Sequence, residues 1–358
     1  MRHVTIKDVA AAAGVSVGTA SKALNGRGKL RAETRARVLR AAEQLAFVPS
    51  VLAQSLLTGR SFSVALITPD TFGRLCLQMA LGAQDVLEAE QIPVLMGEIR
   101  GDPRRERRYM ETFSARQVDG LIIASRRIES VQALRASPAI PVVYALGPSA
   151  GEGVSVLPDV EGGARLAAGH LLAIGRRRIA HITGPKFMPA ARLQARGLNS
   201  VLRAAGIDPC GSAMYGEWSE LWGREAAGRL LAARPDAIFC GSDQIARGAA
   251  DTLRTLGRGI PGDVALVGCG NWVPAALGAL PELTSVDLCL EEVGRVAAGC
   301  LLAALAGEAP QGVRRVTARL VIRRSSGGDG DRQPVPETAT ACQGAHRAHD
   351  YRQTGTPA

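Results

Sequence analysis

The chain has 358 residues, a hydrophobic content of 46%, a mean hydropathy of +0.07 and a formal net charge of +10. This length indicates two or three domains, and this hydrophobic content excludes a wholly disordered chain. No apolar run reaches the roughly 18–20 residues of a membrane-spanning helix, and Lys7 and Asp8 lie where a signal peptide needs an apolar core, so we expect a cytoplasmic protein.

Most of the positive charge lies near the N-terminus. Residues 1–60 contain ten Lys or Arg and three Asp or Glu, a net charge of +7, whereas the other residues contain 33 basic and 30 acidic side chains, a net charge of +3. A basic segment can be a solvated surface, but this concentration favours a polyanionic partner. Charge alone leaves a membrane surface and a nucleic acid as alternatives.

Seven cysteines are scattered through the chain without C-x-x-C pairs or metal-ligand spacing. This usage is typical of a reduced, cytosolic protein in which cysteine is a small hydrophobic residue. We therefore expect no metal site and no cofactor.

The first predicted element is a short helix. Its apolar stripe has helical spacing and consists of Ile6, Val9, Ala10 and Ala13. Thr5 precedes the stripe and Asp8 follows three residues later, which predicts a capping box. Gly14 is expected to end the helix because it tolerates a positive φ.

A second short helix follows, with Ser16 as its predicted cap. Its inward-facing residues would be Ala20, Ala23 and Leu24, and its outer face would consist of Val17, Gly18, Ser21 and Lys22. Two short helices joined by a tight turn with glycine are typical of a helix-turn-helix, although a helical hairpin at the edge of a domain gives a similar pattern.

A third helix is predicted over residues 32–46, because Val38, Ala42 and Leu45 share one face. A short segment follows, which begins at Pro49 and ends at Gly59.

These elements, in this order and spacing, resemble the DNA-binding headpiece and hinge of the LacI/GalR family of bacterial transcription regulators. The matching sequences are Val4-Thr-Ile-Lys-Asp-Val-Ala, Ala13-Gly-Val-Ser, Thr19-Ala-Ser-Lys, Ala23-Leu-Asn-Gly, Glu33-Thr-Arg, Pro49 and Ala53-Gln-Ser-Leu56. The resemblance implies an all-α helix-turn-helix headpiece over residues 1–48 and a hinge helix over residues 49–60.

After residue 61, predicted strands alternate with predicted helices. The strands lie at residues 64–67, 93–96, 119–123, 141–144, 179–183, 236–240 and 263–268, and the helices include residues 75–90, 161–174, 191–205 and 244–256. This alternation predicts an α/β architecture of two doubly wound, parallel-sheet lobes.

The same region resembles the two-lobed core of that family, which is shared with periplasmic binding proteins. The supporting sequences include Val118-Asp-Gly-Leu-Ile, His170-Leu-Leu-Ala-Ile-Gly, Ser242-Asp-Gln-Ile-Ala, Ile260-Pro-Gly-Asp-Val-Ala-Leu-Val-Gly and Leu320-Val-Ile-Arg-Arg-Ser. The resemblance implies an effector-binding and dimerisation core over residues 61–325, with residues 288–306 returning to the first lobe. No leucine heptad follows, so we expect a homodimer, and we predict a disordered tail over residues 326–358.

An enzyme and a sugar-binding transport component are the alternative classes. His170 falls in a predicted helix and His181 in a predicted strand, where hydrogen-bonded core histidines are the expectation. Gly268-Cys-Gly-Asn lacks the spacing of a dinucleotide fingerprint, and no phosphate loop, nucleophile elbow or zinc pattern occurs. A transport component would be exported and would have no headpiece. We therefore predict that the protein is not an enzyme.

The resemblance implies that the headpieces of a dimer bind an operator in double-stranded DNA. Val17, Gly18 and Lys22 would face base edges in the major groove. The other residues expected to contact DNA, mostly at phosphates, are Thr5, Ser16, Thr19, Ser21, Asn25, Thr34, Arg35 and Ala53. Leu56 of the hinge would wedge into the minor groove and kink the DNA.

The resemblance also implies a small-molecule effector site, whose residues here would be Phe72, Arg192, Gln194, Trp218, Ser242 and Gly270. Gln194 and Gly270 take positions at which sugar-binding members often have Arg and Asp, and Trp218 matches an aromatic residue that packs on the ligand. We therefore predict an effector that has fewer hydroxyl groups, or is larger, than a free hexose. A decayed site with constitutive repression is the alternative.

Overall fold

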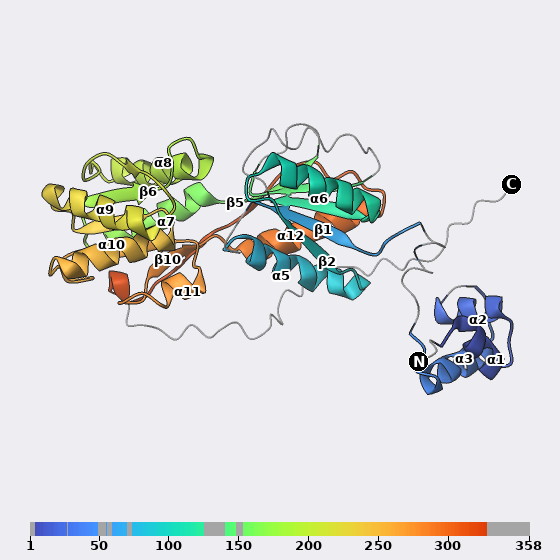
Figure 1. Ribbon diagram of the computed structural model, residues 1–358. Coiled ribbons are helices and arrows are strands. Elements are labelled where there is room, and N and C mark those ends of the chain that lie inside the picture. The colour runs from blue at the N-terminus through green and yellow to red at the C-terminus, as the bar shows by residue number, and fades with distance from the viewer. Residues whose placement is uncertain are drawn as a thin grey trace. The chain divides into compact units, whose positions relative to one another are not determined.

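The computed structural model describes residues 4–26, 28–48, 55, 59–69, 74–124, 140–147 and 153–327 (Figure 1). Beyond the headpiece, the chain divides into two compact core units. The first consists of the segment that precedes Val160 and of Leu288–Ala318, and the second consists of Val160–Asp287 and the segment that follows Ala318.

The headpiece contains three helices, α1 (Ile6–Ala12), α2 (Val17–Leu24) and α3 (Ala32–Gln44). Their apolar faces form one small core around Val9, Ala20 and Val38, all of which are fully buried. The predicted capping box is confirmed, because the Thr5 backbone N–H and the Thr5 hydroxyl both donate to the Asp8 carboxylate, at 2.8 and 2.7 Å. The third helix ends at Gln44 rather than Ala46.

The first core unit is built on a six-stranded sheet whose strands run parallel in the order β11-β5-β4-β3-β1-β2. The strands are β1 (Val64–Thr68), β2 (Val94–Glu98), β3 (Gly120–Ala124), β4 (Val142–Ala145), β5 (Val154–Pro158) and β11 (Gly312–Val316). Helices α5 (Cys76–Leu87) and α12 (Leu290–Leu305) pack together and cover one face of this sheet.

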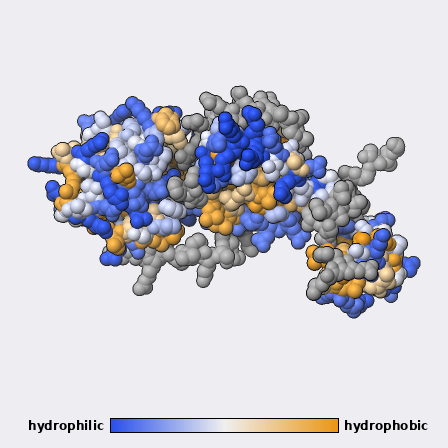
Figure 2. Space-filling view, in the orientation of Figure 1, coloured by the Kyte–Doolittle hydropathy of each residue, from blue (hydrophilic) through white to orange (hydrophobic). Residues whose placement is uncertain are grey.

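Helix α6 (Pro103–Ala115) covers the opposite face of the same sheet. Its inner side inserts Phe113, which is 4% exposed, among the strand residues. Its outer side exposes Arg104, Arg107 and Arg108, which contribute to the hydrophilic surface that Figure 2 shows over this helix.

The second core unit has a six-stranded sheet in the order β12-β10-β9-β8-β6-β7. The strands are β6 (Ile179–Thr183), β7 (Met214–Tyr215), β8 (Ala237–Cys240), β9 (Ala265–Cys269), β10 (Thr284–Asp287) and β12 (Arg319–Val321), of which only β12 runs antiparallel to its neighbour. Helices α7 (Val160–Ala173) and α8 (Pro189–Ala204) pack on one face, α9 (Glu220–Leu230) and α10 (Asp243–Thr255) pack on the other, and the short α11 (Val273–Ala276) follows β9.

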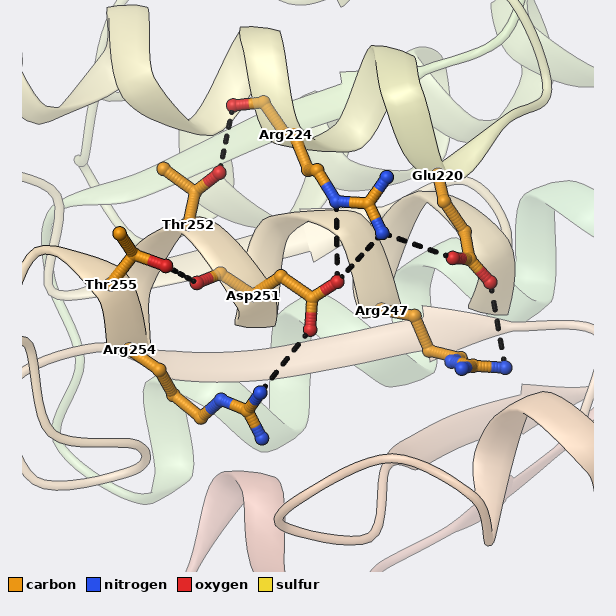
Figure 3. A network of polar contacts seen from close by, with 7 residues as sticks. All are labelled: Glu220, Arg224, Arg247, Asp251, Thr252, Arg254 and Thr255. Atoms are coloured by element: carbon orange, nitrogen blue, oxygen red, sulfur yellow. Dashed lines mark hydrogen bonds and ion pairs between the residues drawn. The ribbon is translucent and has the colours of Figure 1, made fainter.

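Glycines allow the helix pairs α9–α10 and α5–α12 to pack closely. A β-carbon at Gly248 of α10 would overlap the backbone of Glu220 in α9, and β-carbons at Gly82 and Gly294 would overlap the backbones of α12 and α5 respectively. Between α9 and α10, Arg224 of α9 bridges Glu220 and Asp251, and Asp251 also contacts Arg254 (Figure 3). These ion pairs are exposed, so the backbone contacts matter more for stability than the network does.

The predicted alternation of strands and helices is confirmed. Residues 288–306, which were expected to return to the first core unit, belong to it as part of Leu288–Ala318. Five strands were not predicted: β5, β7, β10, β11 and β12. The predicted start of the tail needs a correction, because Ser326 is 2% exposed and belongs to a 3-10 turn, Arg324–Ser326. The rest of the predicted tail, like most of the predicted hinge, lies outside the described residues. None of the described helices is long and apolar enough to cross a membrane.

Candidate DNA-binding surface and effector-binding residues

The outer face of α2 is made of short side chains. Val17 is 42% exposed, Gly18 has no side chain, and Lys22 is exposed one turn further along. Ala20 and Ala23 face the headpiece core, as predicted from the sequence. This arrangement leaves Val17, Gly18 and Lys22 accessible to a groove of DNA.

The polar residues expected at phosphates also stabilise the ends of α2. The Ser16 hydroxyl accepts the Thr19 N–H at 3.1 Å, which confirms the predicted helix cap, and the two hydroxyls lie 2.9 Å apart. Asn25 donates its amide to the Ser21 carbonyl at 2.9 Å. These bonds fix the side chains at the edge of the outer face.

Arg35 and Thr34 lie on α3 and are partly buried. The Arg35 guanidinium donates to the carbonyl of Gly26 at 3.4 Å, which ties α3 to the loop after α2. Phosphate contacts by these residues, and by Thr5, remain predictions.

The basic side chains of the headpiece are available for an anionic partner. No lysine or arginine between residues 4 and 48 forms an ion pair among the described residues, and these cations are Lys7, Lys22, Lys29, Arg31, Arg35, Arg37 and Arg40. Unpaired cations clustered on one small domain favour a polyanion, because each can neutralise a phosphate and release its counterion.

Three predicted residues, Ala53 and Leu56 of the hinge and Phe72 of the effector site, lie outside the described residues. At the end of the hinge, the Gly59 N–H donates to the Ser55 carbonyl at 2.8 Å, and Gly59 has a φ of 68°. A positive φ of this kind is typical of a glycine that follows a helix.

Gln194 lies inside the second core unit. It is 2% exposed, and its amide accepts the Thr183 hydroxyl at 2.7 Å and donates to the Gly241 carbonyl at 2.9 Å and to the Cys269 sulfur at 3.5 Å. These bonds join the ends of β6, β8 and β9. Gln194 thus ties together the carboxyl ends of three inner strands. A ligand would have to displace one of these hydrogen bonds to contact the Gln194 amide.

Ser242 and Arg192 also have local partners. Ser242 is 1% exposed and caps α10, because its hydroxyl accepts the Ile245 N–H at 3.3 Å. Arg192 is exposed, and its guanidinium donates to the carbonyls of Lys186 and Phe187, at 3.2 and 2.7 Å. Arg192 therefore holds the loop after β6 instead of projecting freely.

Trp218 lies against the backbone after β6. A β-carbon at Gly184 would overlap its ring, so glycine is required for this contact. The indole Nε1 is buried and has no hydrogen-bond partner among the described residues. Buried polar groups usually have a hydrogen-bond partner, so this N–H is an exception among the described residues.

The turn after β9 is held by a residue that the sequence analysis passed over. Asp243 is 1% exposed, and its carboxylate accepts the Trp272 backbone N–H at 2.7 Å and the Ser285 hydroxyl at 2.5 Å. Gly270 lies in this turn with a φ of 117°, a conformation that side-chain-bearing residues rarely adopt. The turn therefore favours glycine at position 270.

A second set of polar contacts joins this turn to the points at which the chain leaves and re-enters the unit. Arg323 donates to the Asn271 side-chain oxygen at 2.8 Å, and Asn271 donates to Asp287 at 3.4 Å. Asp287, the last residue of β10, also forms an ion pair of 2.8 Å with Arg319, the first residue of β12. Only spatial contacts between distant segments reveal these partners.

The two core histidines are structural. The ring of His181 stacks on Phe239 with centroids 5.0 Å apart, and its Nδ1 bonds to the Phe239 carbonyl at 2.9 Å. Burial lowers the pKa of His181 to about 4, so the ring is neutral at pH 7. His170 bonds to the Ser326 hydroxyl at 2.7 Å. No metal-binding cluster occurs among the described residues.

Comparison with known proteins accounts for both parts of the chain. Residues 5–50 match the model of bacterial regulatory proteins of the lacI family, and residues 168–326 match a periplasmic binding protein-like domain. The chain is 33% identical over 338 residues to the HTH-type transcriptional regulator CelR of Thermobifida fusca, with 91% of this chain and 99% of the relative covered. It is 31% identical to the HTH-type transcriptional regulator DegA of Bacillus subtilis, with 81% and 88% covered.

Solved structures of transcription regulators have the same fold as this chain. A Lac repressor dimer bound to operator and the anti-inducer ONPF superposes with a TM-score of 0.78 at 25% identity and covers 91% of this chain and 99% of its own. A CelR–cellobiose complex gives a TM-score of 0.66 at 30% identity and covers 90% and 100%. These relatives are transcription regulators and not enzymes, which confirms that prediction. The chain therefore belongs to the lacI family of bacterial regulatory proteins and is a DNA-binding transcription regulator.

Proposed function

We propose that the protein represses transcription by binding a palindromic operator as a homodimer, and that a small-molecule effector bound to the core controls its affinity for DNA. In this proposal the protein is cytoplasmic and associates with the nucleoid when bound. The observation that carries the proposal is a basic headpiece whose described cations lack ion pairs, next to an α2 outer face of Val17, Gly18 and Lys22.

A second copy of the chain is the proposed partner because the relatives include a dimeric Lac repressor. Apolar side chains on the surface of the second core unit support this idea. Val273, Leu277 and Leu280 are 57%, 48% and 69% exposed, and they lie within eight residues of one another on and after α11. An apolar group of this kind is expected to be covered in an assembly.

The affinity for the selected operator is expected to fall steeply with salt. Each neutralised phosphate contributes about −0.9 to the slope of log affinity against log salt, so a dimer that contacts about 6–10 phosphates loses ~10³–10⁵ in affinity between ~50 and ~200 mM salt. The operator is first obtained by in-vitro selection, and fluorescence anisotropy then gives the slope.

Two arginine variants serve as a matched pair for this measurement. Arg37→Gln in the headpiece should reduce the slope by about two, because each protomer of the dimer loses one phosphate contact, whereas Arg107→Gln on α6 should leave it unchanged. A slope near zero, or a complex of one protomer with one DNA, would be incompatible with the proposed function.

The proposed effector is larger than a free hexose or carries fewer hydroxyl groups. Gln194 is committed to bonds within the sheet edge, and Gly270 offers no side chain. Two charged anchors would each contribute about 1.5–3 kcal/mol through hydrogen bonds, so their absence should weaken a plain sugar by orders of magnitude. Trp218 supplies an aromatic surface and an N–H donor without a partner among the described residues.

Calorimetry against a panel of hexoses, pentoses and larger or less polar glycosides tests this prediction. Simple monosaccharides should not bind at micromolar concentrations, and a glycoside that does bind should lose most of its affinity in Trp218→Ala. Trp272→Phe, which alters a different indole, is the control. Micromolar binding of a plain monosaccharide that survives Trp218→Ala would show that the pocket is misplaced, whereas no binding by any compound favours constitutive repression.

A further inference from the structure

The first core unit contains a cavity of about 270 Å³ at the amino ends of β4 and β5. Its floor includes Val143 of β4 and Val154 of β5, which are paired across the two strands and are each 1% exposed. The rest of the lining comes from the residues around β4, the last turn of α12 and the chain that follows α12. The lining residues are Ile140, Pro141, Val142, Val143, Val154, Ala304, Glu308, Ala309 and Pro310.

The sequence at the end of α12 leaves room for this cavity. Ala297 and Leu301 lie on the inner side of the helix and are fully buried in the core of the unit. One turn after Leu301, the helical spacing places Ala304 on the same side. The single methyl group of alanine fills much less of the space above the strand ends than the leucine one turn earlier. A small residue at a core-facing position therefore creates the cavity.

The lining indicates which kind of ligand the cavity would accept. Its side chains are apolar except for that of Glu308, which is exposed, and no lysine or arginine is among the lining residues. Helix α12 ends at Leu305, so its carboxyl end, which carries the partial negative charge of the helix dipole, also lies beside the cavity. The carboxylate and the helix end both favour a cation, and the apolar walls favour a compact hydrocarbon group.

The cavity is separate from the described effector-binding candidates, which lie between residues 192 and 270 in the second core unit. Pro141 of the lining accepts the Leu121 N–H of β3 at 2.9 Å. Just before β3, the Asp119 carboxylate accepts the Ser61 N–H at 2.8 Å. The cavity thus lies at the sheet edge where the chain from the headpiece enters the first core unit.

We propose that this cavity is a second small-molecule site, which binds a compact, positively charged amine with an apolar body. The ammonium group would lie beside Glu308, and the hydrocarbon part would contact Val143 and Val154. Burial of apolar surface would supply most of the affinity, and the exposed carboxylate would add a preference for a cation over a neutral molecule. Binding at this cavity does not require DNA, so it can be tested without an operator.

Fluorine NMR of para-fluorobenzylamine mixed with the full-length chain tests the site. The amine is positively charged at pH 7, and its signal should broaden in a saturable way. Para-fluorobenzyl alcohol has nearly the same shape but no charge, so it should bind about threefold to fivefold more weakly, the difference expected of one exposed charge pair. Glu308→Gln should remove this difference. Glu90→Gln, which neutralises an exposed carboxylate of the same core unit outside the lining, should leave it unchanged.

A second variant, Ala304→Leu, places a larger side chain in the cavity. Filling an existing cavity commonly stabilises a protein, so the thermal midpoint should be unchanged or higher while binding of both probes is lost. Because Glu308 is exposed, Glu308→Gln still tests the charge if Ala304→Leu lowers the midpoint. Three results would overturn the proposal: no saturable binding of the amine, equal binding of amine and alcohol by the wild-type chain, or amine binding that survives Ala304→Leu.

Discussion

The Asp243→Ala variant is expected to lose about 3–6 kcal/mol of unfolding free energy, since each of two hydrogen bonds to a charged acceptor contributes about 1.5–3 kcal/mol. The carboxylate is buried and accepts from Trp272 and Ser285. Without it, a backbone N–H and a hydroxyl lose their acceptor inside the second core unit. Urea denaturation of the full-length chain, followed by circular dichroism, measures the loss.

Two milder variants separate the contributions of the two hydrogen bonds to the loss of stability. Asp243→Asn keeps one acceptor oxygen and should lose less than Asp243→Ala, and Ser285→Ala removes one bond while leaving the carboxylate in place. An Asp243→Ala chain with an unchanged denaturation midpoint would show that the turn at Gly270 has another support.

A second large loss of stability is expected when the close contact between α5 and α12 is disturbed. Gly294→Ala places a β-carbon into the backbone of Met79, and backbone cannot rotate away as a side chain does. Overpacking of this kind costs about 1–3 kcal/mol or more, because the two helices must separate. Thermal denaturation should therefore show a lower midpoint.

Gly299→Ala on the same helix is the matched control. Its added methyl group meets open space, so it should stabilise α12 by up to about 1 kcal/mol. If both variants shift the midpoint in the same direction, the close helix contact is not what requires glycine at position 294.

The headpiece was predictable because its signals are local. The capping box of Thr5 and Asp8, the Ser16 cap and the Gly14 turn all join residues within a few positions of one another, and each was found where the sequence placed it. The apolar spacing likewise identified the buried faces of α1, α2 and α3.

The roles of the predicted effector-binding residues were harder to infer, because resemblance to a family does not reveal whether a side chain is buried or which residues it bonds to. Gln194 was expected near a ligand, yet its amide bonds to residues 11, 47 and 75 positions away. Asp243 appeared only as the neighbour of Ser242, although it holds Trp272 and Ser285 from 29 and 42 positions away. Four of the five missed strands are short or lie at a sheet edge, where period-two patterning is weak: β7, β10 and β12 have two, four and three residues, and β11 is an edge strand that is mostly exposed. β5, by contrast, has five residues, is largely buried and lies between β11 and β4.

Because both core units consist of segments that are distant in the chain, each can complete its fold only late in synthesis on the ribosome. The headpiece has its own apolar core, and all of its helices have been synthesised by residue 44. The first core unit needs residues 288–318, and the second needs β12 and the Arg324–Ser326 turn, so both wait for nearly the last described residue. Domains generally fold from the N-terminus during synthesis. A nascent or prematurely terminated chain therefore acquires the part that recognises DNA long before the parts that regulate it.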